Sequence, residues 1–170
     1  MKKILYDNQM FTFQRFGGVT RYFADLIYNL PAGEFVADTP MRYCENHYVT
    51  ETYGHKYEQL SFPNNYRWRR QVYGFVNRQI SKFAVKYNDY DIFHPTYFSP
   101  YFLKAVKSRQ KPLVVTIHDM TYERYPQDVL IYDRTIPHKK RLIEEELIKD
   151  PMVMIDFLNF KFSVLGEVNG

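Results

Sequence analysis

Two histidines that each follow a short apolar run are the side chains best placed to do chemistry in this sequence. His94 ends the run 91–94, and His118, followed by Asp119, comes directly after the run 113–117. An imidazole can hydrogen-bond a sugar hydroxyl or steady a phosphate, and a neighbouring carboxylate can orient that imidazole or act as a base. We therefore predict that His118 and Asp119 are catalytic, with His118 the first candidate.

The position of these histidines supports the same prediction. Both runs have the pattern of strands, and ligands of open α/β sheets bind in the crevice outside the carboxyl ends of the strands. His94, and Tyr97 in the segment 95–100 that follows, are accordingly predicted to contact the substrate. Structural alternatives stay open, because a lone histidine such as His94 is as often a packed structural residue and Asp119 can cap the turn after its strand.

A pair of glycines precedes the first helical pattern. Gly17 and Gly18 follow a strand-like run at 4–6 and a polar-aromatic loop at 9–16. Glycines let the backbone come close to a ligand, and the N–H groups at a helix start favour an anion such as a phosphate. We predict that Gly17, Gly18 and Arg21 bind a phosphate or the substrate, although a Gly-Gly pair before a helix can also be only a turn.

The segment 66–87 predicts a long basic helix. Its apolar stripe consists of Trp68, Val72, Phe75, Val76, Ile80 and Phe83. Its cations include Arg67, Arg69, Arg70, Arg78, Lys82 and Lys86, and the segment contains no Asp or Glu. Such a helix can contact a membrane surface or a lipid phosphate. A solvated basic face is the plainer interpretation, and we favour it slightly.

The elements that must position these residues alternate between strands and helices. Strands are predicted at 4–6, 34–37, 91–94 and 113–117, and helices at 19–30, 66–87 and 100–107. The run 113–117 is apolar on both faces, as in parallel sheets covered on both sides. The fold class predicted is α/β: a Rossmann-like three-layer αβα arrangement with a parallel sheet.

Composition narrows the class of protein further. The chain has 170 residues, 45% of them apolar, which suits one domain with a packed core and excludes a disordered chain. The formal net charge of +4 suits an anionic partner, but no base-reading motif points to nucleic acid. One cysteine, Cys44, excludes an internal disulfide and fits a reducing, cytoplasmic compartment. We expect no signal peptide, no membrane-spanning helix and no metal site.

Three motifs, in this order, resemble the N-terminal domain of family 4 glycosyltransferases. They are Phe-Gly-Gly-Val-Thr-Arg-Tyr at 16–22, Asp-Ile-Phe-His at 91–94 with the prolines at 95 and 100, and Val-Thr-Ile-His-Asp-Met-Thr-Tyr-Glu at 115–123 with the proline at 126. The likeness covers about residues 2–145. The His-Asp segment is its most specific part.

The resemblance implies the GT-B architecture, in which two Rossmann-like domains face a cleft. The first domain mainly holds the acceptor, and the second holds most of the sugar nucleotide. The implied reaction is retaining hexosyl transfer to a glycan or lipid-linked acceptor of cell-surface polysaccharide synthesis, without a metal or other cofactor. Gly17 and Gly18 would lie near the donor phosphates, His118 near the transferred sugar, and His94 and Asp119 along the same cleft.

The pattern departs from that family after residue 145. A strand-like run after Asp150-Pro151, then 162–170, resembles a segment of outer-membrane polysaccharide export proteins. We expect 1–145 to form the acceptor-side domain and 146–170 a foreign or truncated β-prone tail that is not an independent domain. The donor domain and its pair of glutamates seven residues apart would be missing, so this fragment alone would be inactive. The alternative is a non-enzymatic nucleotide-binding, glycan-binding or membrane-associated module of polysaccharide assembly or export.

Overall fold

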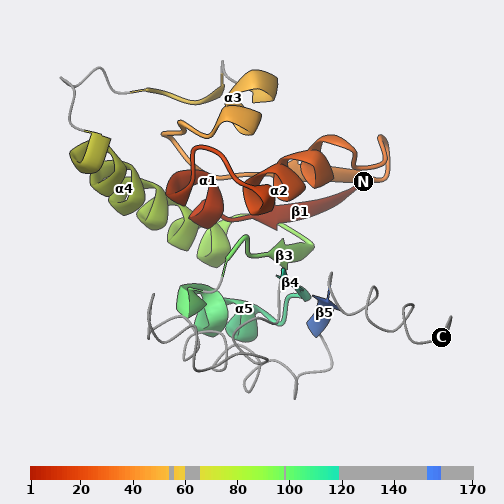
Figure 1. Cartoon of the computed structure of the whole chain (residues 1–170). Coiled ribbons are helices and arrows are strands. Elements are labelled where there is room, and N and C mark those ends of the chain that lie inside the picture. The colour runs from red at the N-terminus through yellow and green to blue at the C-terminus, as the bar shows by residue number, and fades with distance from the viewer. Residues whose placement is uncertain (54–55, 60–65, 98, 119–152, 158–170) are drawn as a thin grey trace, which may run out of the picture.

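A computed structural model describes residues 1–53, 56–59, 66–97, 99–118 and 153–157. Five parallel strands form one sheet in the order β2-β1-β3-β4-β5 (Figure 1). The strands are β1 Lys2–Tyr6, β2 Phe35–Asp38, β3 Ile92–His94, β4 Leu113–Ile117 and β5 Val153–Phe157. The chain runs from β1 to one side and then crosses back to β3 on the other side. The strand order therefore reverses between β1 and β3, where doubly wound sheets open a binding crevice.

Helices cover both faces of this sheet. They are α1 Gln9–Phe13, α2 Gly18–Tyr28, α3 His47–Tyr53, α4 Tyr66–Tyr87, the 3₁₀ helix η2 Pro100–Phe102 and α5 Leu103–Arg109. Successive residues of β1 point to opposite faces, so Ile4 and Tyr6 pack with α1, α2 and α3, whereas Leu5 packs with α4, η2 and α5. The predicted α/β class with helices on both sides of a parallel sheet is thus confirmed.

The predicted elements all appear, with small differences at their ends. The first helix ends at Tyr28, two residues earlier than its periodicity indicates, and the chain turns through Gly33 at a φ of 85°. The loop predicted at 9–16 contains a short helix, α1, and the unassigned stretch after residue 38 contains α3. Both are short helices held by tertiary contacts, so their own periodicity is too brief to identify them.

The predicted tail contributes to the sheet. Strand β5 lies beside β4 in parallel register, with Leu113 opposite Val153 and Ile117 opposite Phe157. A strand after Asp150-Pro151 was expected, but its place in the sheet was not. The segment 162–170 lies outside the described residues, and the foreign origin of the tail stays a prediction.

Helix α4 packs in an unexpected orientation. Its buried residues are Tyr73, Asn77, Ser81, Ala84 and Val85, rather than the apolar stripe. Asn77 satisfies both ends of its amide: Nδ2 donates to Thr12 Oγ1 at 2.9 Å and to the Tyr43 carbonyl at 2.7 Å, and Oδ1 accepts from the Arg42 and Tyr43 backbone N–H groups.

A second polar side chain of α4 is buried in the same way. Ser81 Oγ donates to Asn8 Oδ1 at 2.8 Å, and Asn8 Nδ2 in turn donates to Thr12 Oγ1 at 3.0 Å. A buried amide or hydroxyl is tolerated when its hydrogen bonds are made. These bonds therefore fix which face of α4 turns inward, and they tie α4 to α1.

Candidate functional site

The two strand-end histidines lie together at the carboxyl edge of the sheet. Strand β3 ends at His94, which is opposite Tyr6 at the end of β1, and His118 follows β4 directly. Both imidazoles make edge contacts with the ring of Phe23 in α2, with ring centroids 5.3 Å away for His94 and 5.5 Å for His118. The sheet and the helix after the glycine turn thus bring the predicted residues into one cluster.

His94 is the buried member of this cluster. Its Nε2 shares a hydrogen bond of 2.9 Å with Thr116 Oγ1 on the neighbouring strand, and its ring packs 5.2 Å from that of Tyr6. Burial, and then the nearby His118, lower the pKa of His94 to about 4. The imidazole is therefore neutral near pH 7, and its buried position suits a residue that holds the strand ends in place.

His118 is the more accessible of the two imidazoles. It is half-buried, and its ring makes edge contacts with Tyr22 at 5.3 Å as well as with Phe23. Tyr22 and Phe23 are neighbours in α2, so the second turn of that helix fixes where His118 lies. Asp119, its predicted partner, lies outside the described residues.

The glycine pair begins α2, as the sequence predicts. Thr20 Oγ1 donates to the Gly17 carbonyl at 2.9 Å, but no side chain caps the N–H groups at the helix start, and the first turn contains no acid. A Cβ at Gly17 would overlap Gln14 Oε1, whereas a Cβ at Gly18 would meet nothing within 4 Å. The space beside Gly18 is therefore open, and the uncapped N–H groups at the helix start suit an anion.

Two other predicted residues lie away from this cluster. Arg21 points along the exposed face of α2 and pairs with Asp25, with Nε 3.6 Å from Oδ2. Tyr97 stacks on Phe13 of α1, with ring centroids 6.2 Å apart, and its carbonyl accepts from Gln9 Nε2. Their predicted substrate contacts stay predictions, and the described contacts of both are with the protein itself.

Asp7, directly after β1, is the residue that sequence reasoning missed. Its buried carboxylate accepts hydrogen bonds from the Thr96 N–H at 2.9 Å, Thr96 Oγ1 at 2.7 Å, Tyr101 OH at 3.0 Å and two nitrogens of Gln9. Burial raises the pKa of Asp7, and the bonds from Gln9 and Thr96 oppose that rise. Asp7 joins the loop after β1 to the loop after β3, where the strand order reverses. The sequence signal that could have identified Asp7 is an acidic residue directly after a buried strand.

The predicted lipid-contact cations of α4 divide into two groups. Arg69 pairs with Glu45 in the segment before α3, with Nη1 3.1 Å from Oε1, and Arg70 lies over the Phe13 ring, 4.4 Å from its centroid. Arg78 and Lys82 are exposed. The side chain of Arg67 is outside the described residues. Arg69 also lines a polar cavity of about 180 Å³ beside the glycine turn, together with Arg15, Phe16, Glu45, His47, Thr50 and Gln59.

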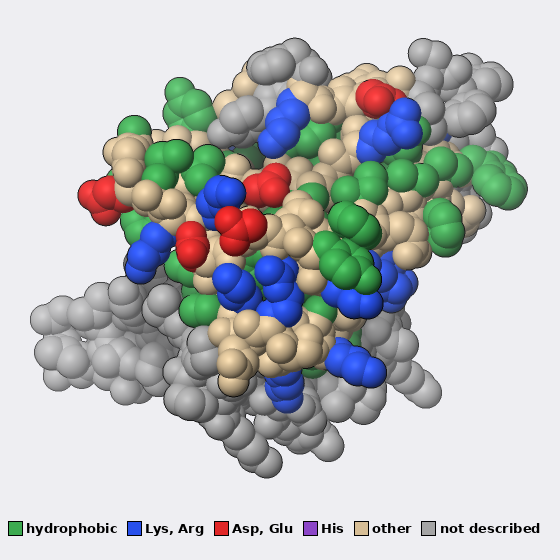
Figure 2. Space-filling model, turned by 180° about the vertical axis from the view of Figure 1, so that it is seen from behind, with side chains coloured by type: hydrophobic (Ala, Val, Ile, Leu, Met, Phe, Trp, Pro, Cys, Tyr) green, Lys and Arg blue, Asp and Glu red, His purple; other side chains and the backbone are tan. Residues whose placement is uncertain are grey.

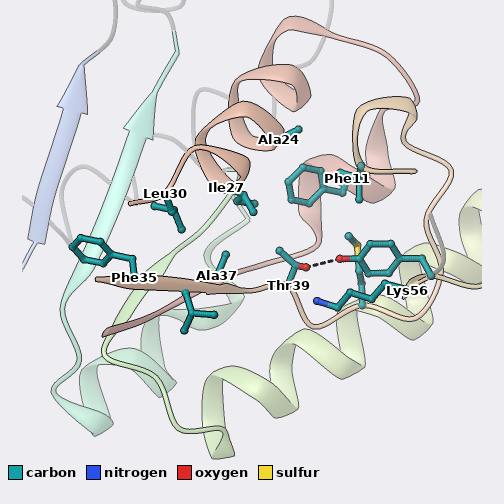
Figure 3. A pocket seen from close by; sticks show the side chains of 12 residues that line it. Phe11, Ala24, Ile27, Leu30, Phe35, Ala37, Thr39 and Lys56 are labelled. Carbon is teal, nitrogen blue, oxygen red and sulfur yellow. Dashed lines mark hydrogen bonds between the residues drawn. The ribbon is translucent and has the colours of Figure 1, made fainter. Parts of the chain in front are cut away.

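An apolar cavity of about 290 Å³ lies between α2 and β2 (Figure 3). It is lined by Phe11, Ala24, Ile27, Leu30, Phe35, Val36, Ala37, Thr39, Met41, Val49, Lys56 and Tyr57. Thr39 and Tyr57 share a hydrogen bond of 2.5 Å at one end, close to Lys56. None of the predicted site residues lines this cavity, so it is separate from the histidine cluster.

Two further findings concern metals and membranes. Among the described residues, no group of three or more His, Cys, Asp or Glu side chains could hold a metal ion. In the same part of the chain, no helix is both long enough and apolar enough to cross a membrane.

The fold and the cluster define a class: a doubly wound parallel α/β domain with a histidine pair at its strand ends. No protein-family model, curated protein or solved structure matches the chain. The glycosyltransferase resemblance therefore rests on the sequence motifs alone, and the function that it implies is a matter for proposal.

Proposed function

We propose that this chain is the acceptor-side domain of a sugar-nucleotide-dependent, retaining glycosyltransferase of cell-surface glycan synthesis. One observation carries the proposal: His94 and His118, at neighbouring strand ends, both contact Phe23 of the helix that follows the glycine turn. A sugar outside these strand ends would meet an imidazole from the sheet and the backbone of the turn. Ligands of open α/β sheets bind at this edge.

The proposed chemistry divides between the turn and His118. Glycosyl transfer moves the anomeric carbon from a phosphate oxygen to an acceptor hydroxyl, so negative charge grows on the departing phosphate. The uncapped start of α2 has no acid in its first turn and complements that charge. His118 hydrogen-bonds a hydroxyl of the transferred sugar and thereby positions the anomeric carbon.

His94 and Asp7 act as positioning residues in this proposal. His94 is buried and neutral, and its hydrogen bond to Thr116 holds the end of β3 against β4. Asp7 holds the loop after β1 against the loop after β3. Neither needs to touch the sugar, because each fixes the backbone from which the crevice is built.

The proposal can be tested by supplying a donor domain. The donor-binding domain of a family 4 glycosyltransferase is fused after Phe157, so that β5 stays in the sheet, and sugar transfer is assayed with a panel of sugar nucleotides and glycan or lipid-linked acceptors. We expect His118→Ala to lower turnover by about 100-fold, the usual scale for a positioned catalytic side chain.

Tyr28→Ala is the control, because Tyr28 is 68% exposed, lies at the opposite end of α2 from the glycine turn and lies outside the histidine cluster. It should keep transfer within about threefold of the unmodified fusion, since a substitution outside the cluster leaves the reacting geometry in place. Equal activity of the fusion and its His118→Ala variant would contradict the role of His118. Binding of a nucleotide or glycan, with no transfer for any donor, would favour the non-enzymatic module instead.

A further inference from the structure

The outward face of α4 is apolar and aromatic. Trp68, Phe75 and Phe83 are 66%, 68% and 61% exposed, and they follow one another along the helix on the side opposite Asn77 and Ser81. Figure 2 shows apolar side chains in a diagonal row over α4. Large aromatic rings that share one exposed face usually mark a surface that binds something.

The charge beside this row has one sign. Arg78, Lys82 and Lys86 are exposed on the same helix, and α4 contains no Asp or Glu. Figure 2 shows Lys and Arg side chains along the lower side of the apolar row. Among the described residues, the exposed ion pairs lie elsewhere, such as Lys3 with Asp89 and Arg42 with Glu58. In the same part of the chain, Arg78 and Lys82 have no ion pair, and Lys86 lies over the exposed ring of its neighbour Tyr87, 4.9 Å from the ring centroid.

The packing explains why this arrangement is stable. Helix α4 is held to the domain by the Asn77 and Ser81 hydrogen bonds and by stacking of Tyr73 on Tyr43, with ring centroids 4.9 Å apart. Its aromatic stripe is not needed to attach it. A helix with aromatic residues on one face and Lys and Arg beside them has the composition of helices that lie in a membrane interface.

We propose that the outward face of α4, defined as Trp68, Val72, Phe75, Phe83, Arg78, Lys82 and Lys86, binds the surface of an anionic lipid bilayer. The aromatic rings enter the interface between headgroups and acyl chains, and the cations contact the lipid phosphates. The positive charge of the three flanking cations complements the negative charge of lipid phosphates. This complementarity favours an anionic bilayer over a purely apolar partner, which would not require the cations. This proposal does not depend on glycosyl transfer, and either can fail without the other.

Trp68 provides a direct test, since it is the chain's single tryptophan. The full chain is mixed with vesicles of phosphatidylcholine alone or with about 30% phosphatidylglycerol, and Trp68 emission and co-sedimentation are measured. We expect a blue shift and sedimentation with the anionic vesicles, and quenching by brominated acyl chains, because the ring moves from water into the interface. No change in emission with anionic vesicles overturns the proposal.

Two double variants separate the apolar and the ionic parts. Phe75→Ser with Phe83→Ser should weaken vesicle binding by about tenfold or more, because two rings no longer leave water. Arg78→Gln with Lys82→Gln should weaken it by about 25-fold, roughly fivefold for each cation near an anionic surface. Tyr28→Ser is the matched control, since Tyr28 is equally exposed, at 68%, but lies on α2.

The outcomes distinguish the possible occupants of the face. If both double variants bind vesicles as the unmodified chain does, and the Tyr28 control does not differ from them, the face is not the lipid contact. If the chain dimerises in light scattering without lipid, and Phe75→Ser with Phe83→Ser abolishes the dimer, a second copy covers the face. Either result overturns the membrane assignment.

Discussion

Helices α2 and α4 turn opposite kinds of side chain toward the domain. Helix α2 turns one of its aromatic residues, Phe23, inward against the two strand-end histidines. Helix α4 turns Asn77 and Ser81 inward and leaves Trp68, Phe75 and Phe83 outside. Apolar burial attaches α2, whereas a set of satisfied hydrogen bonds orients α4. The difference teaches that an apolar stripe identifies a helix but does not by itself say which face the domain buries.

Removing one aromatic ring from each helix is the strongest test of this difference in packing. Phe23→Ala should lower the free energy of unfolding by about 4 kcal/mol, because it empties a fully buried site between the histidines. Phe75→Ala should change it by less than about 0.5 kcal/mol, because the ring is exposed. Urea unfolding followed by circular dichroism measures both. Equal losses would show that α4 buries its stripe.

A pH series tests the burial of His94. Burial lowers the pKa of its imidazole from the ordinary 6.5 to about 4 on folding, so between these pH values the unfolded chain binds a proton that the folded chain does not. Stability should therefore fall as the pH drops from 6.5 toward 4, by up to about 3 kcal/mol from this group.

The neutral variant His94→Gln isolates that contribution. Its stability is expected to be lower at pH 7 but to decline less than that of the unmodified chain between pH 6.5 and 4. Thermal unfolding at four pH values provides the comparison. Parallel curves for the two proteins would mean that His94 keeps an ordinary pKa and is not buried at the strand ends.

The hydrogen bonds of Asn77 predict an intermediate effect. Asn77→Ala leaves the backbone N–H groups of Arg42 and Tyr43 and the Tyr43 carbonyl without their partner, which should cost about 2 kcal/mol. Gln79→Ala, at an exposed position of the same helix, is the control and should change little. Urea unfolding of the two variants measures this cost. An Asn77→Ala variant with unchanged stability would contradict the conclusion that polar contacts orient α4.

The smallest effect on stability is expected at the glycine turn. A Cβ at Gly18 meets nothing within 4 Å, so Gly18→Ala should leave stability within about 0.5 kcal/mol or raise it slightly. The same methyl group points into the open space beside the turn and should weaken phosphate or sugar-nucleotide binding. Calorimetric titration checks the binding, and unchanged affinity would place the ligand elsewhere.

The sequence predicted the features that depend on local residue patterns, namely the type of each long element and the residues at strand ends. The apolar run 113–117 and the helix 66–87 are long or uniform enough for their type to follow from periodicity, and His94 and His118 were placed at strand ends for the same reason. The orientation of α4 could not be predicted, because it depends on hydrogen bonds between Asn77 and backbone groups some 34 residues away in the chain. Asp7 was missed because its partners are still farther away along the chain: Thr96 is 89 residues away and Tyr101 is 94 residues away.

One measurement tests the central claim most directly: the imidazole resonances of the whole chain, followed by NMR while sugar nucleotides and glycan acceptors are added. Because His118 is half-buried beside α2 and His94 is buried, a sugar at the strand ends should shift His118 most and His94 less. Saturable shifts in that order would support a sugar site at the strand ends. No shift of His118 with any donor or acceptor would contradict it.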